Sequence, residues 1–449
     1  MRRWPLLVPE HPRSLAALRI SITAILLVSP ETYSAPRIAS LPFALLSAPE
    51  GLGWALHTMP ITPALARAAQ AVFVLSLVSG LLGFWSRLSL SLVTLSGLYV
   101  LGLFQLTGAV THDMHLLWFS AVLAQSPCGE SASVDRLLAK HRGVSPPRPS
   151  LSAAVPLFFA RTLLGLVYFF PGFWKLRASG IAWITSDNLR NQMYWKWYEN
   201  GVVPPWRIDH SRSLLLAAAL GVVLLELSFP LLVLFPKTRP AAVVGGLVFH
   251  ACSQVFLFIP FVSLWGCYVI LVDWGPLRPS RAEATKDLVA SSRRWLPESG
   301  RAAAVGVTLI ALVVFRGARD EIQAWPFACY PTFQFRADST IPDLVMQAVH
   351  ADGTTELLPD GPGARGRRTQ DEWAMAWRVA GLYGTAPSAD QLRAYLVHAR
   401  KKPAIDAIAR RAKAVRFYRA WYSVVPEDAE LPPVRTEPLL EVAPWQDEL

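Results

Sequence analysis

The chain has 449 residues, of which 53% are hydrophobic and only 17% are charged, whereas an ordinary soluble domain carries about 25% charged residues. This shortage of polar side chains excludes a purely soluble protein, and the long apolar runs between residues 14 and 316 indicate a polytopic membrane protein. The formal net charge of +11 fits cytoplasmic loops that face anionic lipid better than it fits nucleic-acid binding, because the basic residues lie in short loops between apolar runs.

The apolar runs predict an all-α membrane protein with about nine transmembrane helices. The first helix is expected after the basic N-terminus, and the whole set lies near residues 15–28, 64–86, 88–108, 114–126, 151–173, 213–235, 241–259, 261–274 and 302–316. The fourth, eighth and ninth runs are shorter than the roughly 20 residues that a spanning helix needs.

The distribution of basic residues predicts the orientation. Lysine and arginine are more frequent in the loops that share a side with the N-terminus than in the loops on the other side, and basic loops stay in the cytoplasm. We therefore expect a multi-pass protein of the cell (inner) membrane with a cytoplasmic N-terminus. Residues 1–316 would form the transmembrane domain, and residues 317–449 a small α+β extracytoplasmic domain.

The long loop 174–212 is unusual for an outer loop because it combines basic residues with many aromatic ones. Two interpretations stay open: an amphipathic segment along the membrane surface, or a lid over a cavity that opens outward. The aromatic side chains are Trp174, Trp183, Tyr194, Trp195, Trp197, Tyr198 and Trp206.

The C-terminal region reads as a soluble domain. Two strands joined at Asp352-Gly353 are expected, since this dipeptide favours tight hairpins. Helices are predicted over 371–383 and 387–416, and the acidic, proline-containing tail from Pro426 is expected to be disordered.

Ionisable residues inside apolar runs are functional candidates by default, because burying them in a membrane is costly. Arg19 lies in the first run and Glu226 in the sixth, and each is a possible partner of the other. His112, Asp113 and His115 form the sequence THDMH, in which hydrogen bonding or proton transfer by His115 is favoured over metal binding.

Two further polar positions stand out. Lys175 ends the fifth run, where it is either an interfacial lysine or a partly buried amine that acts as a base. His250 lies in the middle of the seventh run, with Gln254 one turn later. Gly245 and Gly246 nearby permit close helix packing, so a buried polar pocket is expected there.

These motifs, taken in order, resemble the vitamin K-dependent gamma-carboxylase and its bacterial relatives, the HTTM-domain membrane proteins. The similar segments cover about residues 15–335. They are LRISITAIL with its arginine, SPCGESASVDRLL after the histidine-bearing run, ARTLLGLVYFFPGFWKL, LLELSFPLLVLFPKTR, VFHACSQVFLFIPF and WPFACYPTF.

The resemblance implies a lyase-type carboxylase that couples oxygenation of a quinol to its epoxide with carboxylation of glutamate. Reduced vitamin K or menaquinol would be the cofactor, CO2 and O2 the co-substrates, and a glutamate-containing peptide or protein the partner. Lys175 would match the base, and His115 and His250 the catalytic histidines. Gln254 and the aromatic residues Trp174 and Trp183 would line the quinone site.

The chain departs from the animal enzyme in two respects. It has Trp174-Lys175 where the animal enzyme has two lysines, and its C-terminal region is much smaller. The alternative is therefore a non-catalytic membrane protein that binds quinone or lipid or scaffolds a partner. In either case we expect no metal and no nucleic acid, and the sequence leaves the oligomeric state open.

Overall fold

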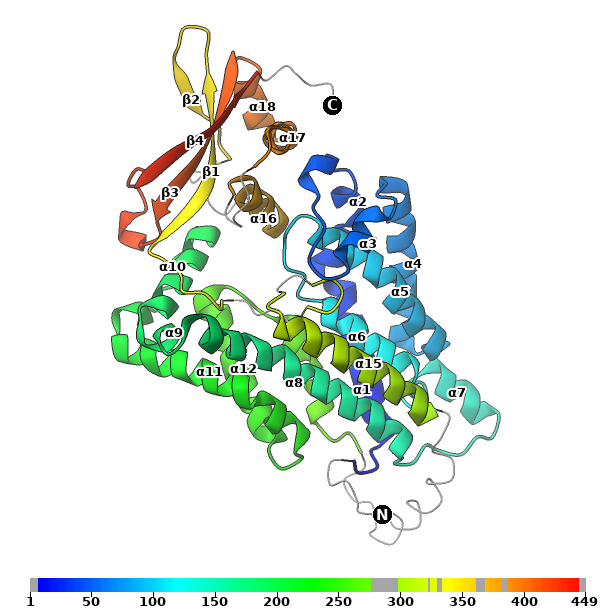
Figure 1. Cartoon of the computed structure of the whole chain (residues 1–449). Helices are drawn as coiled ribbons and strands as arrows, with labels where there is room; N and C mark the ends of the chain where they lie inside the picture. Colours follow the sequence, from blue (N-terminus) through cyan, green and yellow to red (C-terminus); the bar gives the residue numbers. More distant parts are fainter. Residues whose placement is uncertain are drawn as a thin grey trace.

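A computed structural model describes residues 7–275, 298–321, 324–328, 333–360, 368–381 and 387–443 of the chain. A bundle of helices forms most of the molecule, and a small domain with an antiparallel sheet packs at one end of it (Figure 1). Helix α1 begins at the end of the bundle opposite to this sheet.

Six helices are long and apolar enough to cross a membrane, which confirms the helical membrane architecture. They are α4 (Pro63–Leu82), α5 (Ser86–Gln105), α8 (Leu151–Ser179), α11 (Arg212–Leu234), α12 (Arg239–Leu257) and α15 (Glu298–Ala318). The last of these was expected to be short, over 302–316, but it extends by a turn at its N-terminal end.

The expected count of about nine spanning helices is not confirmed. Among the described residues, the other apolar helices are shorter: α1 (Pro12–Val28), α6 (Met114–Ala124), and the pair α13 (Val262–Trp265) and η4 (Gly266–Leu271). Every residue of α6 except Ala121 is buried. A helix enclosed by its neighbours does not need bilayer length, which explains why apolarity alone overestimates the count.

Helix α8 is the central element of the bundle, packed against α11 on one side and α15 on the other (Figure 1). Its close approach to α11 depends on Gly172. A Cβ atom added there would lie 2.7 Å from the Cβ atom of Glu226. The small residue thus brings a carboxylate on α11 against the face of α8.

Arg19 does not pair with Glu226, the possible partner that the sequence offered. Its guanidinium is fully buried and donates to four backbone carbonyls: those of Gly80, Leu81, Cys128 and Ala132. The guanidinium thereby ties α1 to the C-terminal end of α4 and to the loop before α7 (Val134–His141).

Asp135 completes this junction by accepting hydrogen bonds at the N-terminus of α5. The backbone N–H groups of Trp85 and Ser86 each donate to its carboxylate at 2.8 Å. A carboxylate in this position satisfies unpaired N–H groups and complements the helix dipole. Two of the segments that carry the family resemblance, the arginine of the first run and the SASVD loop, therefore have a structural role.

Short helices cover the end of the bundle that faces the small domain. They are η1 (Pro30–Tyr33), α2 (Ala35–Ile38), η2 (Phe43–Leu45), α3 (Gly53–Thr58), α9 (Ala182–Thr185), α10 (Asn188–Asn200) and η3 (Ile208–His210). The aromatic loop 174–212 thus consists of the end of α8, then α9, α10 and η3.

The C-terminal domain is a four-stranded antiparallel sheet in the order β2-β1-β3-β4 with helices beside it. Its elements are β1 (Thr340–Val349), β2 (Thr355–Leu357), α16 (Gln370–Val379), α17 (Ala389–Ala399), α18 (Pro403–Ala409), β3 (Ala414–Ser423), η6 (Pro426–Asp428) and β4 (Arg435–Val442). The hairpin at Asp352-Gly353 is confirmed, because β1 and β2 pair on either side of it.

Two expectations for this domain are wrong. The stretch 387–416 is not one helix: it contains α17, α18 and the start of β3, with Pro403 beginning the second helix. The tail from Pro426 is not disordered over its described part, since β4 pairs with β3. Pro438 in β4 is compatible with the sheet because β4 is an edge strand and the register shifts beside this position.

Polar contacts hold the two domains together. Arg37 in α2 forms an ion pair with Asp371 of α16. Arg378, two turns later on α16, donates to the carbonyls of Leu45 and Leu106 in the bundle. On the opposite side, Arg207 binds Glu427 of η6 at 2.9 Å.

The Arg37–Asp371 pair predicts a pH-dependent stability. Burial alone would raise the pKa of Asp371, but hydrogen bonds from Arg37 and Thr369 outweigh burial and hold the pKa below its ordinary value of 3.8. Because the folded-state pKa is the lower one, the stabilisation is present above about pH 4 and is lost as the pH falls through the folded-state value.

We expect Asp371→Asn to destabilise the protein by about 1 kcal/mol at neutral pH, and the difference from the native protein to narrow as the pH falls below about 4. Thermal midpoints of both proteins in detergent, measured across this range, check the prediction. Asp390→Asn, at a carboxylate that is 70% exposed, is the control. A difference in thermal midpoint between the native protein and Asp371→Asn that does not change with pH would contradict the prediction.

Candidate functional site

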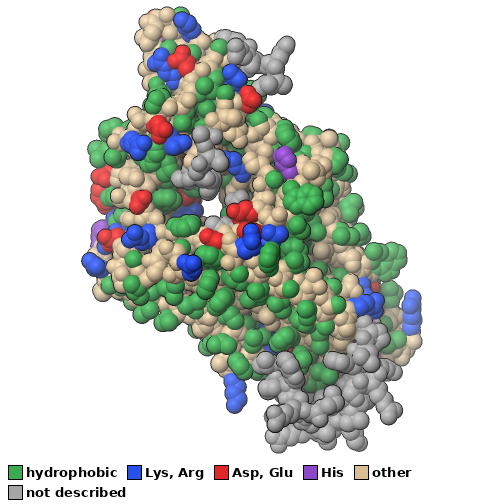
Figure 2. Space-filling view, viewed as in Figure 1, with side chains coloured by type: hydrophobic (Ala, Val, Ile, Leu, Met, Phe, Trp, Pro, Cys, Tyr) green, Lys and Arg blue, Asp and Glu red, His purple; other side chains and the backbone are tan. Residues whose placement is uncertain are grey.

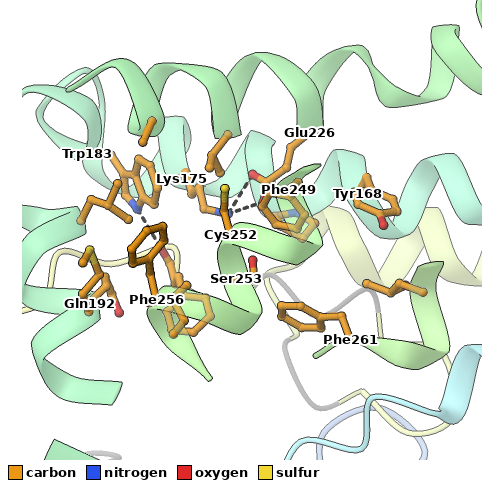
Figure 3. Close-up of a pocket in the computed structure, with 18 of the residues that line it drawn as sticks. Tyr168, Lys175, Trp183, Gln192, Glu226, Phe249, Cys252, Ser253, Phe256 and Phe261 are labelled. Carbon is orange, nitrogen blue, oxygen red and sulfur yellow. Dashed lines mark hydrogen bonds and ion pairs between the residues drawn. The ribbon is translucent and has the colours of Figure 1, made fainter. Parts of the chain in front are cut away.

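An apolar pocket lies between α8, α10, α11 and α12 (Figure 3). Its cavity volume is about 140 Å³. Its lining consists of Val167, Tyr168, Pro171 and Lys175 from α8, Trp183 from α9, Leu189, Gln192 and Met193 from α10, Ile208 from η3, Ala218, Val222 and Glu226 from α11, Phe249, Cys252, Ser253, Phe256 and Leu257 from α12, and His112, Phe261, Leu264 and Phe333.

The only ion pair between two residues of this lining, within the described chain, joins Lys175 and Glu226. The ammonium Nζ of Lys175 donates to both carboxylate oxygens, at 2.7 and 2.8 Å, and both residues are less than 5% exposed. Trp183 lies beside the amine, with its ring centroid 5.2 Å from Nζ. In Figure 3, Lys175 points toward Glu226 across the upper part of the pocket.

The placement of this pair follows from the helices that carry it. Lys175 is close to the C-terminal end of α8, and Gly172 leaves the space into which Glu226 projects from α11. Each charge would be strongly destabilising if it were buried alone, and the bidentate contact removes most of that cost. The pair is electrically neutral as a whole, so it can lie in an apolar wall.

A second polar group, two turns earlier on α8, consists of Tyr168, His250 and Tyr268. The hydroxyl of Tyr168 lies 2.5 Å from Nε2 of His250 and 2.6 Å from the hydroxyl of Tyr268. All three side chains are buried. Gly246 makes room for Tyr268, because a Cβ atom added there would lie 2.0 Å from its hydroxyl.

Helix α10, which carries Gln192 and Met193 into the pocket, is fixed by a buried carboxylate. Asp209 accepts a hydrogen bond from the hydroxyl of Tyr194 at 2.8 Å and forms an ion pair with Arg207. Burial and the bond to Asp209 raise the pKa of Tyr194 to about 12. The loop after α10 is therefore held against this helix.

A larger chamber lies between the bundle and the C-terminal domain, with a cavity volume of about 1640 Å³. Figure 2 shows this hollow, with acidic and basic side chains near its rim. Both domains line it: the segments 28–37, 47–50, 108–113 and 257–263 and helix α10 come from the bundle side, and 333–337 and α16 from the C-terminal side.

The pocket and the chamber share part of their lining, so they are neighbouring compartments. The shared residues are His112, Gln192, Leu257, Phe261 and Phe333. Phe261 and Phe333 have positive φ angles of 44° and 59°, as does Phe258 at 57°. Non-glycine residues in this conformation are strained and are concentrated at functional sites.

The structure brings some of the predicted site residues together. Lys175 and Trp183 both line the pocket, and His250 lies directly behind it through its contact with Tyr168. His115 does not line it. His115 is buried in α6, with Nε2 2.9 Å from the carbonyl of Ser263, and its neighbour His112 lies at the wall instead.

Gln254 and Trp174 lie outside the pocket. Gln254 is exposed on α12 and does not share the buried face of His250. Trp174 points from α8 toward α15, where its Nε1 donates to the carbonyl of Gly317 at 2.6 Å. Consecutive residues of a helix face different directions, so Trp174 and Lys175 could not both line one pocket wall.

Sequence reasoning missed Tyr168 as a site residue and did not place Glu226 beside Lys175. Glu226 was recognised as an unusual buried carboxylate, but its partner is Lys175 and not Arg19. Tyr168 precedes Lys175 by seven residues, a spacing that places both on one helix face, and this signal could have identified it. Among the described residues, no group of three or more His, Cys, Asp or Glu side chains is placed to hold a metal ion.

The comparison with known families covers most of the bundle and every lining residue of the pocket except Phe333. The chain matches no curated protein and no solved structure. It matches the HTTM domain over residues 8–274, which is more than half of its length. The matched region contains both members of the Lys175–Glu226 pair and the Tyr168 group. The chain therefore belongs to the HTTM domain family of membrane proteins.

Proposed function

We propose that this protein is a quinol-dependent membrane enzyme that couples oxygenation of a reduced vitamin K or menaquinol-type cofactor to carboxylation of glutamate. The HTTM domain is associated with vitamin K-dependent carboxylase-like membrane proteins. The observation that carries the proposal is the buried amine of Lys175 at the wall of an apolar pocket, next to a larger chamber that charged side chains also line.

The pocket fits a lipophilic ring. Its walls are mostly aliphatic and aromatic, and a few polar groups converge on it, as is usual in small-molecule sites. Ala218 on α11 and Cys252 on α12 belong to the lining, and both residues are exposed. The pocket thus reaches the surface between these two spanning helices, where a quinol with an apolar tail would enter from the bilayer.

The Lys175–Glu226 pair supplies the base. When bound, the quinol supplies the oxygen chemistry that produces a strong base and its own epoxide. A proton that moves from Nζ of Lys175 to the Glu226 carboxylate leaves a neutral amine without creating an unpaired buried charge. This amine then takes a proton from a hydroxyl of the ligand, and the ammonium faces the resulting oxyanion.

The chamber would hold the glutamate-containing peptide or protein, with CO2 and O2 as co-substrates. Most basic residues of its lining are engaged: Arg37 with Asp371, Lys196 with Glu199, and Arg368 with Asp343. Arg336 is exposed in the lining and forms no ion pair with another described residue. Its guanidinium is therefore available for a substrate carboxylate.

The proposed topology places this chamber outside the cytoplasm. The excess of basic residues on the N-terminal side favours a cytoplasmic N-terminus and an extracytoplasmic C-terminal domain in the inner membrane. The substrate peptide would then reach the chamber from the extracytoplasmic side.

A second candidate function is binding of quinone or lipid without catalysis. The observation that favours it is the bidentate contact itself, which satisfies both charges internally and keeps the amine occupied. Under this alternative, ligand binding would be retained and no product would form.

The first test replaces the base. Lys175→Ala is expected to lower the rate of epoxide formation from a reduced naphthoquinol by about a thousandfold, because general-base catalysis contributes on the order of 10²–10⁴. The measurement is epoxide production by purified protein in lipid, with labelled bicarbonate to follow carboxylation of a glutamyl peptide separately.

Two controls make this test decisive. Lys140→Ala, at an exposed position on α7, should retain full activity. The double variant Lys175→Met with Glu226→Gln removes both charges, so that neither is left buried alone, and it should fold without activity. Undiminished epoxide formation by either Lys175 variant would contradict the proposed base, and binding without product in the native protein would favour the second candidate.

The chamber generates a separate prediction. Arg336→Gln is expected to raise the KM for a glutamyl peptide by about tenfold, because one charge-assisted hydrogen bond contributes roughly 1.5–3 kcal/mol, while epoxide formation stays unchanged. Steady-state carboxylation with varied peptide measures this effect, and Arg142→Gln, at the exposed residue that follows α7, is the control. An unchanged KM would show that Arg336 does not hold the substrate carboxylate.

A further inference from the structure

Ser253 lies on the face of α12 that is directed into the bundle. The buried residues of this helix recur at spacings of three or four and form one stripe, which consists of Ala242, Gly246, His250 and Ser253. Ser253 is 5% exposed and lines the apolar pocket. In Figure 3 its oxygen points into the pocket from α12. The wall of the pocket therefore carries a serine hydroxyl.

The hydroxyl of Ser253 forms no hydrogen bond with another described residue. A serine within a helix often donates to the carbonyl of the residue four positions earlier. Ser91, Ser96 and Ser120 do so in α5 and α6, at 2.9, 2.5 and 3.0 Å. Ser253 does not make the corresponding bond to Phe249. Its hydroxyl therefore keeps the capacity to donate one hydrogen bond and to accept two.

Five other polar side chains of the lining form hydrogen bonds within the protein. Lys175 and Glu226 bind each other, and the side-chain N–H groups of Trp183 and Gln192 donate to backbone carbonyls at 2.7 and 3.2 Å. The hydroxyl of Tyr168 contacts two neighbouring side chains. A ligand competes with protein groups at these five positions, whereas at Ser253 it meets an uncommitted hydroxyl.

An unpaired hydroxyl is unfavourable at a buried position, because it has lost hydrogen bonds to water without gaining others. The same stripe of α12 holds an alanine at Ala242, which avoids this cost. A ligand that places an oxygen atom next to Ser253 would supply the missing partner within the apolar walls. A hydroxyl suits a reduced and an oxidised ligand alike, because it accepts from a hydroxyl group and donates to a carbonyl.

We propose that Ser253 is a ligand-binding residue of the apolar pocket and that its hydroxyl forms a hydrogen bond with an oxygen atom of the bound ring. Ser253 then favours an oxygenated ring over a hydrocarbon of the same shape, which makes it a specificity-determining residue. The inference rests on the proposed function for the identity of the ring. It adds a contact from α12, a third helix beside those that carry Lys175 and Glu226.

The test measures equilibrium binding to purified full-length protein in lipid nanodiscs without oxygen, so that no turnover occurs. The two radiolabelled probes are a 1,4-naphthoquinol with a short isoprenoid tail and the naphthalene that carries the same tail but no ring oxygen. Ser253→Ala is expected to weaken quinol binding by about fivefold, which is within the range of one net hydrogen bond. The affinity for the naphthalene should not change.

Ser120→Ala is the matched control. Ser120 is also a buried helical serine, but its hydroxyl donates to the carbonyl of Leu116, and it lines neither the pocket nor the chamber. This variant should bind both probes as the native protein does. Thermal midpoints without ligand give a second measurement. The midpoint of Ser253→Ala should not lie below that of the native protein, because no hydrogen bond within the protein is lost.

The other outcomes separate the inference from the proposed function. A Ser253→Ala variant that does not fold, or whose midpoint is lowered, would show that the protein itself needs the hydroxyl and would overturn the inference. Equal weakening of both probes would mean that Ser253 only shapes the pocket, and unchanged quinol binding would mean that its hydroxyl meets only water. Either result would overturn the inference while the quinol site stands. Native protein that binds neither probe would overturn the proposed function and the inference with it.

Discussion

The neutral ion pair between Lys175 and Glu226 is the constraint on which the site depends. Two charges can lie in the apolar interior of the bundle only because they meet in a bidentate contact, and they meet because Gly172 allows α11 to approach α8. The pair fixes the pocket between these helices and α12. Because the pair is neutral as a whole, a proton can move from Lys175 to Glu226 without leaving an unpaired buried charge, and the neutral amine that results can act as a base.

The apolar pocket and the neighbouring chamber suit ligands of different polarity. A lipophilic ligand is best placed in the apolar pocket within the spanning helices, whereas a polar substrate is best placed in the chamber under the C-terminal domain. The wall that they share is formed by the polar side chains of His112 and Gln192 and by three apolar side chains, with strained backbone at Phe261 and Phe333. The C-terminal domain, held by the Arg37–Asp371 pair, thus completes the chamber and does not merely extend from the bundle.

The sequence was sufficient for features that depend on composition and local pattern. Apolar runs identified the spanning helices, and the isolated Lys175 in such a run identified the base candidate. It was insufficient where the outcome depended on packing. Helix α6 can be short because its neighbours enclose it. Glu226 pairs with Lys175 because Gly172 allows α11 to approach α8. Strand β4 is ordered because it pairs with β3. Rotation of α12 decided that His250 is buried and Gln254 exposed.

The most direct measurement is photolabelling of the protein in lipid with a photoreactive naphthoquinone, followed by mass spectrometry of the labelled peptides. A ligand in the apolar pocket should label the peptides that contain residues 167–175 and 249–257, and an excess of unlabelled naphthoquinol should compete with this labelling. Labelling spread over the exposed faces of α4 and α5 without competition would contradict a quinol site at the Lys175–Glu226 pair.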